Sequence, residues 1–317
     1  MDAETRQAIE HSDWNGVRTR LLELHRESRA AVGLGTTSPL SALQLAALHD
    51  AEAAQRLLDR GLPCDAHSAA ALGRLDDLRR HAGDFSDLAE HLTPMGFALL
   101  KGRLDSVEAL LDAGDDPNRP LPRIGFFVWE PKAIGSGTWA PLHMASAHGY
   151  HADAGATVAA LIRSGAHMAA RCPLGETALH LAATFGWRPV LECLLANGAN
   201  IDEGTARISP TIHGLASPKH APVAHRQTPL MIAAREGGVD TVAFLVEQGA
   251  SIDASDSNGA TALHIAARPW WRENVELLEA LLAAGARRDV RDSRGRTPLD
   301  LARAAGFSQT AAALEGK

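Results

Sequence analysis

Fifteen histidines are the residues of this chain most able to do chemistry, because an imidazole can transfer protons or bind a metal near neutral pH. His213, His220 and His225 share one Pro-rich stretch, at spacings of seven and five residues. Zinc ligands usually come in pairs about two to five residues apart and often include cysteine. No cysteine is near these histidines. We therefore predict no metal site and no cofactor, and interpret the three as loop residues.

Catalytic motifs are missing from the sequence. It contains no GxSxG, no HExxH, no phosphate-binding glycine loop and no CxxC pair. A histidine and a carboxylate can together carry acid–base chemistry. His148, His213, Arg235 and Glu236 would be the polar members of such a site, but no spacing demonstrates the pairing. Whether the protein is an enzyme stays open, with a non-enzymatic role favoured.

Aromatic residues gather in the stretch from Arg119 to Trp139, RPLPRIGFFVWEPKAIGSGTW. Its glycines and prolines exclude a long regular helix. Aromatic side chains bury a large area at low entropic cost, which makes them frequent binding hot spots. They could equally form a small core of the stretch itself, so both interpretations stand. The aromatics concerned are Phe126, Phe127, Trp129 and Trp139.

Composition narrows the class of partner and the cellular compartment. A net charge of −7 provides no basic field for a phosphate backbone, which argues against nucleic acid. The three cysteines have no framework spacing, the N-terminus is polar, and no apolar run approaches the roughly 18 residues of a membrane span. We expect a cytoplasmic protein that binds neither nucleic acid nor membrane.

One unit repeats along the chain, and it must position all of these residues. An apolar segment that opens with Thr-Pro-Leu or Thr-Ala-Leu is followed by a second apolar segment and usually by Gly-Ala. The step from Thr228 to Thr261 is 33 residues. The aligned segments are Ala140-PLHMASAHG, Thr177-ALHLAATFG, Thr228-PLMIAAREG, Thr261-ALHIAARPW and Thr297-PLDLARAAG.

This pattern resembles the ankyrin repeat family, whose 33-residue unit carries T-P-L-H-x-A. The resemblance implies a β-turn finger followed by two antiparallel helices in each unit. It predicts an all-α solenoid of about eight helix-turn-helix repeats plus an N-terminal capping helix pair. It also implies that His143, His180 and His264, at the His of TPLH, tie each turn to the neighbouring loop.

Each repeated residue type has a physical reason. Threonine at the helix entry caps free N–H groups, and proline next to it tolerates the first helical turn. Paired alanines let the inner helices approach their neighbours closely, and Leu-Leu fills the layer between helix pairs. Glycine just past the second helix takes the left-handed conformation.

We predict one continuous solenoid over 1–317, because no repeat can bury its apolar face alone. Its predicted parts are an N-terminal cap (1–37), degenerate repeats (38–119), an aromatic insertion (120–139), repeats (140–203), a His/Pro insertion (204–226), and repeats with a C-terminal cap (227–317).

Three departures from the period mark candidate functional segments. Thr93 to Ala140 spans 47 residues and Thr177 to Thr228 spans 51, so both exceed the repeat at the finger position. We expect these two insertions to touch over the repeat between them and to share a surface with the helix that starts at Pro141. The third departure places Trp270 and Trp271 at a turn between two helices.

The repeat phase also predicts which side chains face the groove. They are the two residues after each paired alanine, with neighbours at the fingers. These residues are Ala147 and His148, Thr184 and Phe185, Arg235 and Glu236, Arg268 and Pro269, with Glu176, Gln227, Asp256, Ser257 and Asn258 at the fingers.

Two functions remain at this point. The first is a protein-binding scaffold that uses the concave groove and the two inserted finger loops. The alternative is a small-molecule-binding or catalytic protein with an aromatic pocket roofed by 120–139 and 204–226. The candidate binding residues for either are Phe126, Phe127, Trp129, Trp139, His148, Phe185, His213, Arg235, Glu236, Trp270 and Trp271.

Overall fold

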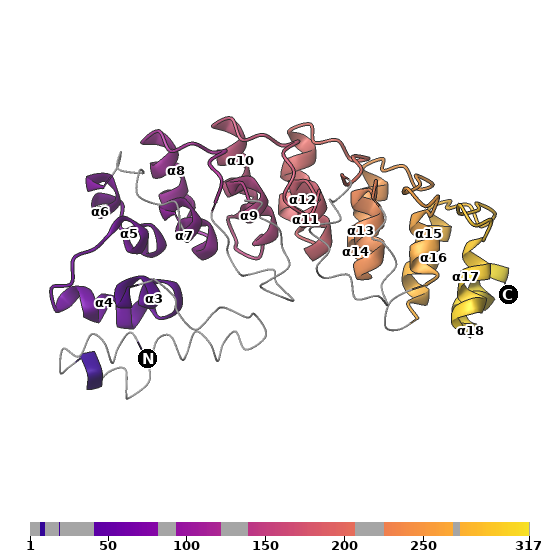
Figure 1. The fold of residues 1–317 in the computed structure, drawn as a ribbon, viewed down its shortest axis with the longest axis horizontal. Coiled ribbons are helices and arrows are strands. Elements are labelled where there is room, and N and C mark those ends of the chain that lie inside the picture. Colours follow the sequence, from indigo (N-terminus) through magenta and orange to yellow (C-terminus); the bar gives the residue numbers. More distant parts are fainter. Residues whose placement is uncertain are drawn as a thin grey trace. The chain divides into compact units, whose positions relative to one another are not determined.

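A computed structural model describes residues 7–9, 19, 41–81, 93–121, 139–206, 225–268 and 273–316. The described residues form two compact units, one up to His167 and the other from Met168 onward. Figure 1 labels the helices of both. The single solenoid over 1–317 therefore stays a prediction.

The first unit is a series of helices that follow one another in pairs. In each pair the two helices pack against each other. The pairs are α3 (Ala42–His49) with α4 (Ala51–Asp59), α5 (Ala66–Leu72) with α6 (Leu75–Arg80), α7 (Pro94–Lys101) with α8 (Leu104–Asp112), and α9 (Pro141–Ala147) with α10 (Ala154–Arg163).

The second unit repeats the same arrangement, again with each pair in contact. Its pairs are α11 (Ala178–Phe185) with α12 (Arg188–Ala196), α13 (Pro229–Glu236) with α14 (Val239–Glu247), α15 (Ala262–Ala266) with α16 (Val275–Ala283), and α17 (Pro298–Ala305) with α18 (Ser308–Glu315). Apart from an isolated antiparallel bridge between Leu121 and Trp139, the regular structure of the described residues is helical. The all-α prediction is confirmed.

Each unit has two layers of helices. The first helix of each pair contacts the first helix of the next pair. In the first unit this order is α3, α5, α7 and α9, and in the second unit it is α11, α13, α15 and α17. We call these the inner helices. Second helices of neighbouring pairs also contact each other: α6 contacts α8 and α8 contacts α10 in the first unit, and α14 contacts α16 and α16 contacts α18 in the second. We call the second helices of all pairs the outer helices.

The core lies between the two layers and has the predicted composition. Inner helices contribute buried alanines, such as Ala182 and Ala183 in α11 and Ala233 and Ala234 in α13. Each buried leucine stabilises the fold by about 1.5–3 kcal/mol relative to an exposed one. The outer-helix leucines that are buried are Leu57, Leu78, Leu110, Leu161, Leu194, Leu245, Leu281 and Leu314, among others.

Threonine caps the start of several inner helices, as predicted, but a histidine takes part in the cap at two of them. The hydroxyls of Thr93, Thr228 and Thr297 accept a backbone N–H from the first turn of α7, α13 and α17. At Thr177 and Thr261 a histidine of the first turn joins the cap, because its Nδ1 atom lies 3.2 Å from the threonine backbone nitrogen. The imidazole is therefore part of the helix start as well as of the contact to the next repeat.

Glycines end the outer helices as predicted. The φ angles of these glycines lie between +86° and +95°, a region that residues with a Cβ atom rarely adopt. Gly114, for example, donates its N–H to the Leu111 carbonyl and so closes α8. The glycines are Gly61, Gly114, Gly165, Gly198, Gly249 and Gly285.

The predicted N-terminal cap, 1–37, lies almost wholly outside the described residues. Of the residues that are described, Ile9 is buried against α3 and α4, where its neighbours include Leu45, Ala53 and Leu57. This contact agrees with a segment that covers the first helix pair. The number of repeats and the nature of both caps stay predictions.

Two left-handed glycines of the first unit offer a matched stability test. Gly102 (φ +61°) and Gly114 (φ +91°) both have left-handed conformations that strain any residue with a Cβ atom, and a Cβ atom on Gly102 would also overlap the His151 ring. Gly114→Ala should cost about 1–2 kcal/mol of unfolding free energy from the φ angle alone. Gly102→Ala should cost more, as measured by urea denaturation. Equal losses would show that His151 does not pack on this turn.

Candidate interaction surface

Two repeat histidines connect their own helix to the next finger. The Nε2 atom of His180 lies 2.9 Å from the Gln227 carbonyl oxygen, and that of His264 lies 3.1 Å from the Arg296 carbonyl oxygen. A carbonyl oxygen only accepts, so Nε2 carries the hydrogen and Nδ1 accepts from the threonine at the helix start. The structural role predicted for these histidines is confirmed.

His180 is held neutral by its surroundings. The side chain is fully buried, and burial lowers its pKa to about 4, while the hydrogen bond to Gln227 works in the opposite direction. An imidazole with this pKa is uncharged at neutral pH. His180 therefore stabilises the repeat and is not available for acid–base chemistry. His143 has the same position in α9, and its Nδ1 accepts the Ala140 N–H at 3.2 Å.

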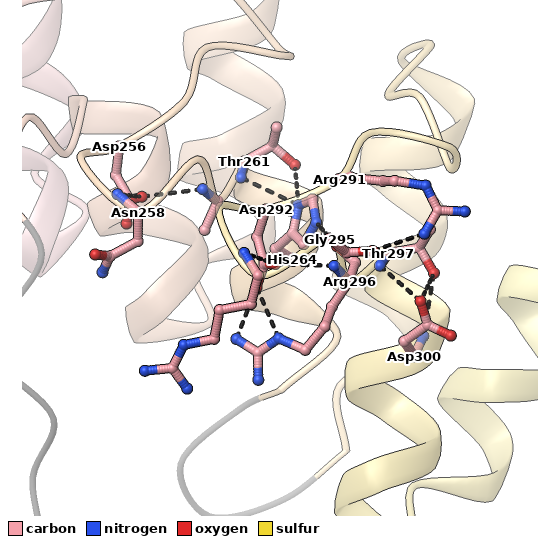
Figure 2. A network of polar contacts seen from close by, with 12 residues as sticks. Asp256, Asn258, Thr261, His264, Arg291, Asp292, Gly295, Arg296, Thr297 and Asp300 are labelled. Carbon is pink, nitrogen blue, oxygen red and sulfur yellow. Dashed lines mark hydrogen bonds and ion pairs between the residues drawn. The ribbon is translucent and has the colours of Figure 1, made fainter.

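Buried aspartates organise the last two fingers of the second unit, as Figure 2 shows. Asp292 accepts the backbone N–H groups of Arg294 and Arg296 on one oxygen, both at 2.9 Å. Its other oxygen accepts two N–H groups of the Arg296 guanidinium at 2.9 and 2.7 Å. Asp256 accepts the backbone N–H groups of Asn258 and Ala260 in the same manner.

Sequence reasoning missed this role, although a signal was present. Asp256 and Asp292 both stand three residues before a glycine and five before a capping threonine. Cys172 occupies the corresponding place before Gly175 and Thr177, and its backbone N–H likewise donates to the residue four positions on. Burial raises the pKa of the Cys172 thiol to about 11, so this thiol is a structural group.

Consecutive fingers of the second unit are joined by backbone hydrogen bonds. The Ala206 N–H donates to the Gly175 carbonyl at 2.9 Å, and the Ser293 N–H donates to the Asn258 carbonyl at 2.8 Å. Ser257 donates to the His225 carbonyl at 2.9 Å. The fingers are thus fixed relative to one another within this unit.

Residues at the two ends of each predicted insertion, 120–139 and 204–226, are paired. The Leu121 N–H donates to the Trp139 carbonyl at 2.7 Å. Thr205 donates to the Gln227 carbonyl at 2.9 Å and accepts the Arg226 N–H at 2.8 Å. The stretches between these pairs, 122–138 and 207–224, lie outside the described residues. Their structure, their mutual contact and the shared surface with the helix from Pro141 stay predictions.

Polar side chains gather beside α13. We call Glu176, Gln227, Arg235 and Glu236 the α13 polar cluster. The Arg235 guanidinium donates to the Glu236 carboxylate at 3.0 Å and to the Gln227 side-chain oxygen at 2.9 Å, so its side chain connects the end of α13 to the finger before it. Burial raises the pKa of Glu176; Arg235 lowers it and Glu236 raises it further.

An exposed aromatic lies at the same level as this cluster. Phe185 is the last residue of α11 and Glu236 the last of α13, each followed by a left-handed glycine, and the two helices pack against each other. Phe185 is 39% exposed, and its ring stacks on Trp187 at a centroid distance of 6.3 Å. Phe185 and Glu236 are thus exposed and Arg235 is partly exposed, and their predicted role in binding stays a prediction.

In the first unit, the structure corrects the expectation for the end of α9. His148 was expected to be exposed, but it is only 9% exposed, because it closes the helix and its ring lies edge-on to Tyr150 at 5.8 Å. Ala147, expected beside it on the groove, is buried as well. Tyr150, which the sequence analysis did not single out, is the exposed residue here, at 56%. It is the one tyrosine of the chain.

Comparisons with known proteins match the repeat. A model of the single ankyrin repeat matches residues 174–206, and a model of three consecutive ankyrin repeats matches 211–292 and 230–314. The crystal structure of the human ASB11 ankyrin repeat domain superposes with a TM-score of 0.58 and 29% identity, covering 80% of this chain and 96% of that one.

The chain is an ankyrin repeat protein.

One curated relative of this ankyrin repeat protein is the Danio rerio protein described as putative palmitoyltransferase ZDHHC13. The two are 29% identical over 194 residues, which make up 56% of this chain and 27% of the relative. The chain thus matches about a quarter of that protein's length. The activity in the relative's description is a statement about that protein.

Several predicted site residues of the ankyrin repeat protein cannot be placed. Of the residues that can, Trp139 is partly buried with its ring edge-on to His143 at 6.3 Å. No described contact supports the alternative of an aromatic small-molecule pocket. The predicted site residues outside the described ranges are Phe126, Phe127, Trp129, His213, Trp270 and Trp271.

Neither a candidate metal site nor a membrane-spanning helix is present among the described residues. They contain no group of three or more His, Cys, Asp or Glu side chains placed to hold a metal ion. None of the described helices has the length and apolar character that a membrane crossing requires.

Two aspartates of the last finger make a matched pair for mutation. Burial alone would raise the pKa of Asp292, but hydrogen bonds from Arg296 and backbone N–H groups outweigh it, so the pKa lies below its usual value. Asp292→Ala leaves these donors unpaired and should cost about 2–3 kcal/mol of unfolding free energy. Asp289, paired with Arg287 in solvent, should change little when replaced by alanine. Equal losses in urea denaturation would contradict the role of the finger carboxylate.

His180 predicts a loss of stability in acid. Its pKa is about 4 in the folded chain and about 6.5 in an unfolded one, so the unfolded chain binds the proton first as the pH falls. The contribution is complete above pH ~6.5 and about 3 kcal/mol is lost by pH ~4. His180→Gln, less stable at pH 7, should lack this part of the pH dependence, whereas exposed His167→Gln should retain it. Parallel stability–pH curves for wild type and His180→Gln would refute the assignment.

Proposed function

We propose that this ankyrin repeat protein is a protein-binding scaffold that takes up its partner with the concave groove and the two inserted finger loops. Ankyrin repeats generally act as protein-interaction modules, which supports the broad part of the proposal. One observation supports the finer part. The large apolar side chains that are exposed among the described residues are Tyr150, in the turn that follows inner helix α9, and Phe185, the last residue of inner helix α11.

Exposed aromatic residues at these positions favour protein recognition. The core of each repeat is formed by buried alanines and leucines of the helices. The packing of the repeat therefore does not require a large exposed ring at Tyr150 or Phe185. Aromatic rings bury much area on binding at a low entropic cost and are frequent hot spots. In the second unit the α13 polar cluster lies beside Phe185 and provides the polar rim that such interfaces have.

The proposal extends to residues that the structure does not describe. We include the insertion aromatics Phe126, Phe127 and Trp129, together with His213 and the pair Trp270–Trp271, as further contacts, because they belong to the segments that exceed the repeat. We also propose a cytoplasmic location, and a partner that is neither nucleic acid nor membrane, on the basis of the charge and cysteine usage.

Site-specific cross-linking tests the use of this face. A photoreactive benzoylphenylalanine would replace Phe185 at the end of α11, and a control chain would carry it in place of Leu195 on outer helix α12. We expect a protein that cross-links in cells through position 185 and not through position 195. Phe185→Ala should then weaken binding of the purified partner by about tenfold, the loss typical of a hot spot, and Leu195→Ala should leave it unchanged.

The opposite results would remove the proposal. If both positions cross-link the same set of proteins, position 185 reports only random collisions. If the partner binds Phe185→Ala as tightly as wild type, the aromatic residue at the end of α11 is not part of the interface.

A further inference from the structure

One finger of the second unit carries an arginine in a backbone conformation that suits glycine. Arg226, two positions before the capping Thr228, has a φ angle of +63°, in the left-handed region. The other three fingers of this unit have glycine at that position, with φ angles between +72° and +75°: Gly175, Gly259 and Gly295. A left-handed residue with a Cβ atom costs free energy that glycine does not. The turn therefore contains an arginine although glycine would form it at a lower cost.

Neighbouring residues hold the backbone of Arg226 in this conformation. Its N–H donates to the Thr205 carbonyl at 2.8 Å, and the N–H of the next residue, Gln227, donates to the Thr205 hydroxyl at 3.1 Å. A Cβ atom on Gly204 would lie 2.9 Å from the Arg226 Cα atom, so the two backbones are in close contact. The Arg226 side chain, in contrast, is exposed and makes no hydrogen bond or ion pair with a described residue. The finger thus fixes the backbone and leaves the guanidinium available.

A second arginine without a carboxylate partner lies in the turn of the last finger. Arg294 is exposed, and its guanidinium makes no hydrogen bond or ion pair within the described part of the chain. Its neighbours differ, because Arg296 is bound by Asp292 and Arg291 donates to a carbonyl of the same finger at 2.6 Å (Figure 2). The segment 287–296 contains five arginines and two aspartates, an excess of three positive charges in a chain whose net charge is −7. The last finger therefore has a guanidinium that its own carboxylates do not neutralise.

Arg226 and Arg294, which we call the fingertip arginines, lie on fingers that backbone hydrogen bonds join. The N–H of Ser257, in the finger between them, donates to the His225 carbonyl at 2.9 Å, and the last finger is joined to this middle finger in the same way at 2.8 Å. Two repeat steps of about 8–10 Å each place the two turns roughly 16–20 Å apart. An extended chain rises about 3.3 Å per residue, so about five or six residues cover this distance.

We propose that the fingertip arginines bind two carboxylates, about six residues apart, on an extended acidic segment of a partner protein. A guanidinium has a planar set of donors that matches a carboxylate. A nucleic acid would bring a charge at every nucleotide and would be repelled by the rest of a chain of net charge −7. The inference rests on the proposed function and adds the chemistry of the partner to it. The cost of a left-handed arginine at position 226 is then explained by the contact that its side chain makes.

Two peptides of equal charge test the spacing without knowledge of the partner. The peptide acetyl-ETSTSTE-amide has its two glutamates at the expected spacing, and acetyl-TSEETST-amide has them adjacent. Each is titrated into the full chain, and NMR follows the Nε–H groups of Arg226 and Arg294. We expect saturable binding of the spaced peptide that weakens as salt is added, and weaker binding of the adjacent one. The lysine peptide acetyl-KTSTSTK-amide should cause no saturable change.

Variants of the two arginines separate the charge from the backbone. Arg226→Gly should weaken binding of the spaced peptide by about threefold to tenfold and should raise the midpoint of urea unfolding, because the left-handed strain is removed. Arg226→Lys keeps both the charge and the strain, so it should retain more affinity and the midpoint of the wild type. Arg294→Gln should weaken binding to a similar extent. Arg287→Gln, which removes an exposed arginine already paired with Asp289, should leave the affinity unchanged.

Several results would overturn the inference. The two acidic peptides could bind equally, or the double variant Arg226→Gly, Arg294→Gln could bind the spaced peptide as tightly as wild type. A lower urea midpoint for Arg226→Gly would mean that the arginine serves stability alone. A thymidine oligonucleotide that binds more tightly than the spaced peptide would show that the partner class is wrong.

Failure of this inference and failure of the proposed function can be told apart, because partner capture through position 185 is measured separately. If a partner captured there binds the double variant as tightly as wild type, the scaffold role stands and the fingertip site is excluded. If the spaced peptide binds as expected and nothing cross-links at position 185, it is the scaffold role of the groove that fails.

Discussion

Close contact between successive inner helices is the constraint on which the rest of each unit depends. A single helix pair has too little apolar surface to form a core, so its stability comes from its neighbours. Paired alanines, such as Ala182–Ala183 in α11 and Ala233–Ala234 in α13, allow adjacent helices to approach, and leucines of the outer helices fill the layer behind them. Larger residues at the alanine positions would separate the helices and expose these leucines.

The same constraint determines where recognition residues can lie. Most of the surface of an inner helix is buried, as in α13, where residues Pro229 to Ala234 are all buried. The last residues of these helices and parts of the fingers before them remain accessible. Phe185, Arg235 and Glu236 occupy such ends, and Glu176 is partly exposed in its finger, whereas the predicted finger residues Gln227 and Asp256 are buried. A binding surface at the accessible positions costs the core nothing, because none of their side chains is needed to fill it.

The sequence was sufficient for the features that repeat and insufficient for those that occur once. Threonine caps and left-handed glycines could be predicted because the same residue types recur in phase along the chain, and the contact of His180 with the next finger could be predicted because the repeat resembles the ankyrin family. His148 could not: its position in the repeat suggested exposure, but α9 ends without the left-handed glycine that follows α11 and α13, and the turn brings Tyr150 over the imidazole. The finger aspartates escaped notice because Cys172 replaces one of them. Segments longer than the repeat, such as 120–139, have no internal period from which a conformation could be derived.

The position before each capping threonine shows how one site can serve both structure and recognition. Its backbone carbonyl is fixed, by a repeat histidine at Gln227 and Arg296 and by the N–H of the residue four positions earlier at Glu176, Ala260 and Arg296. Its side chain is under no such requirement and differs in every repeat of the second unit: Glu176, Gln227, Ala260 and Arg296. Arg296 binds Asp292 of its own finger and Gln227 binds Arg235, so both are satisfied internally. A position that is constrained only through its backbone can therefore take side chains as different as Glu176 and Arg296 without disturbing the finger.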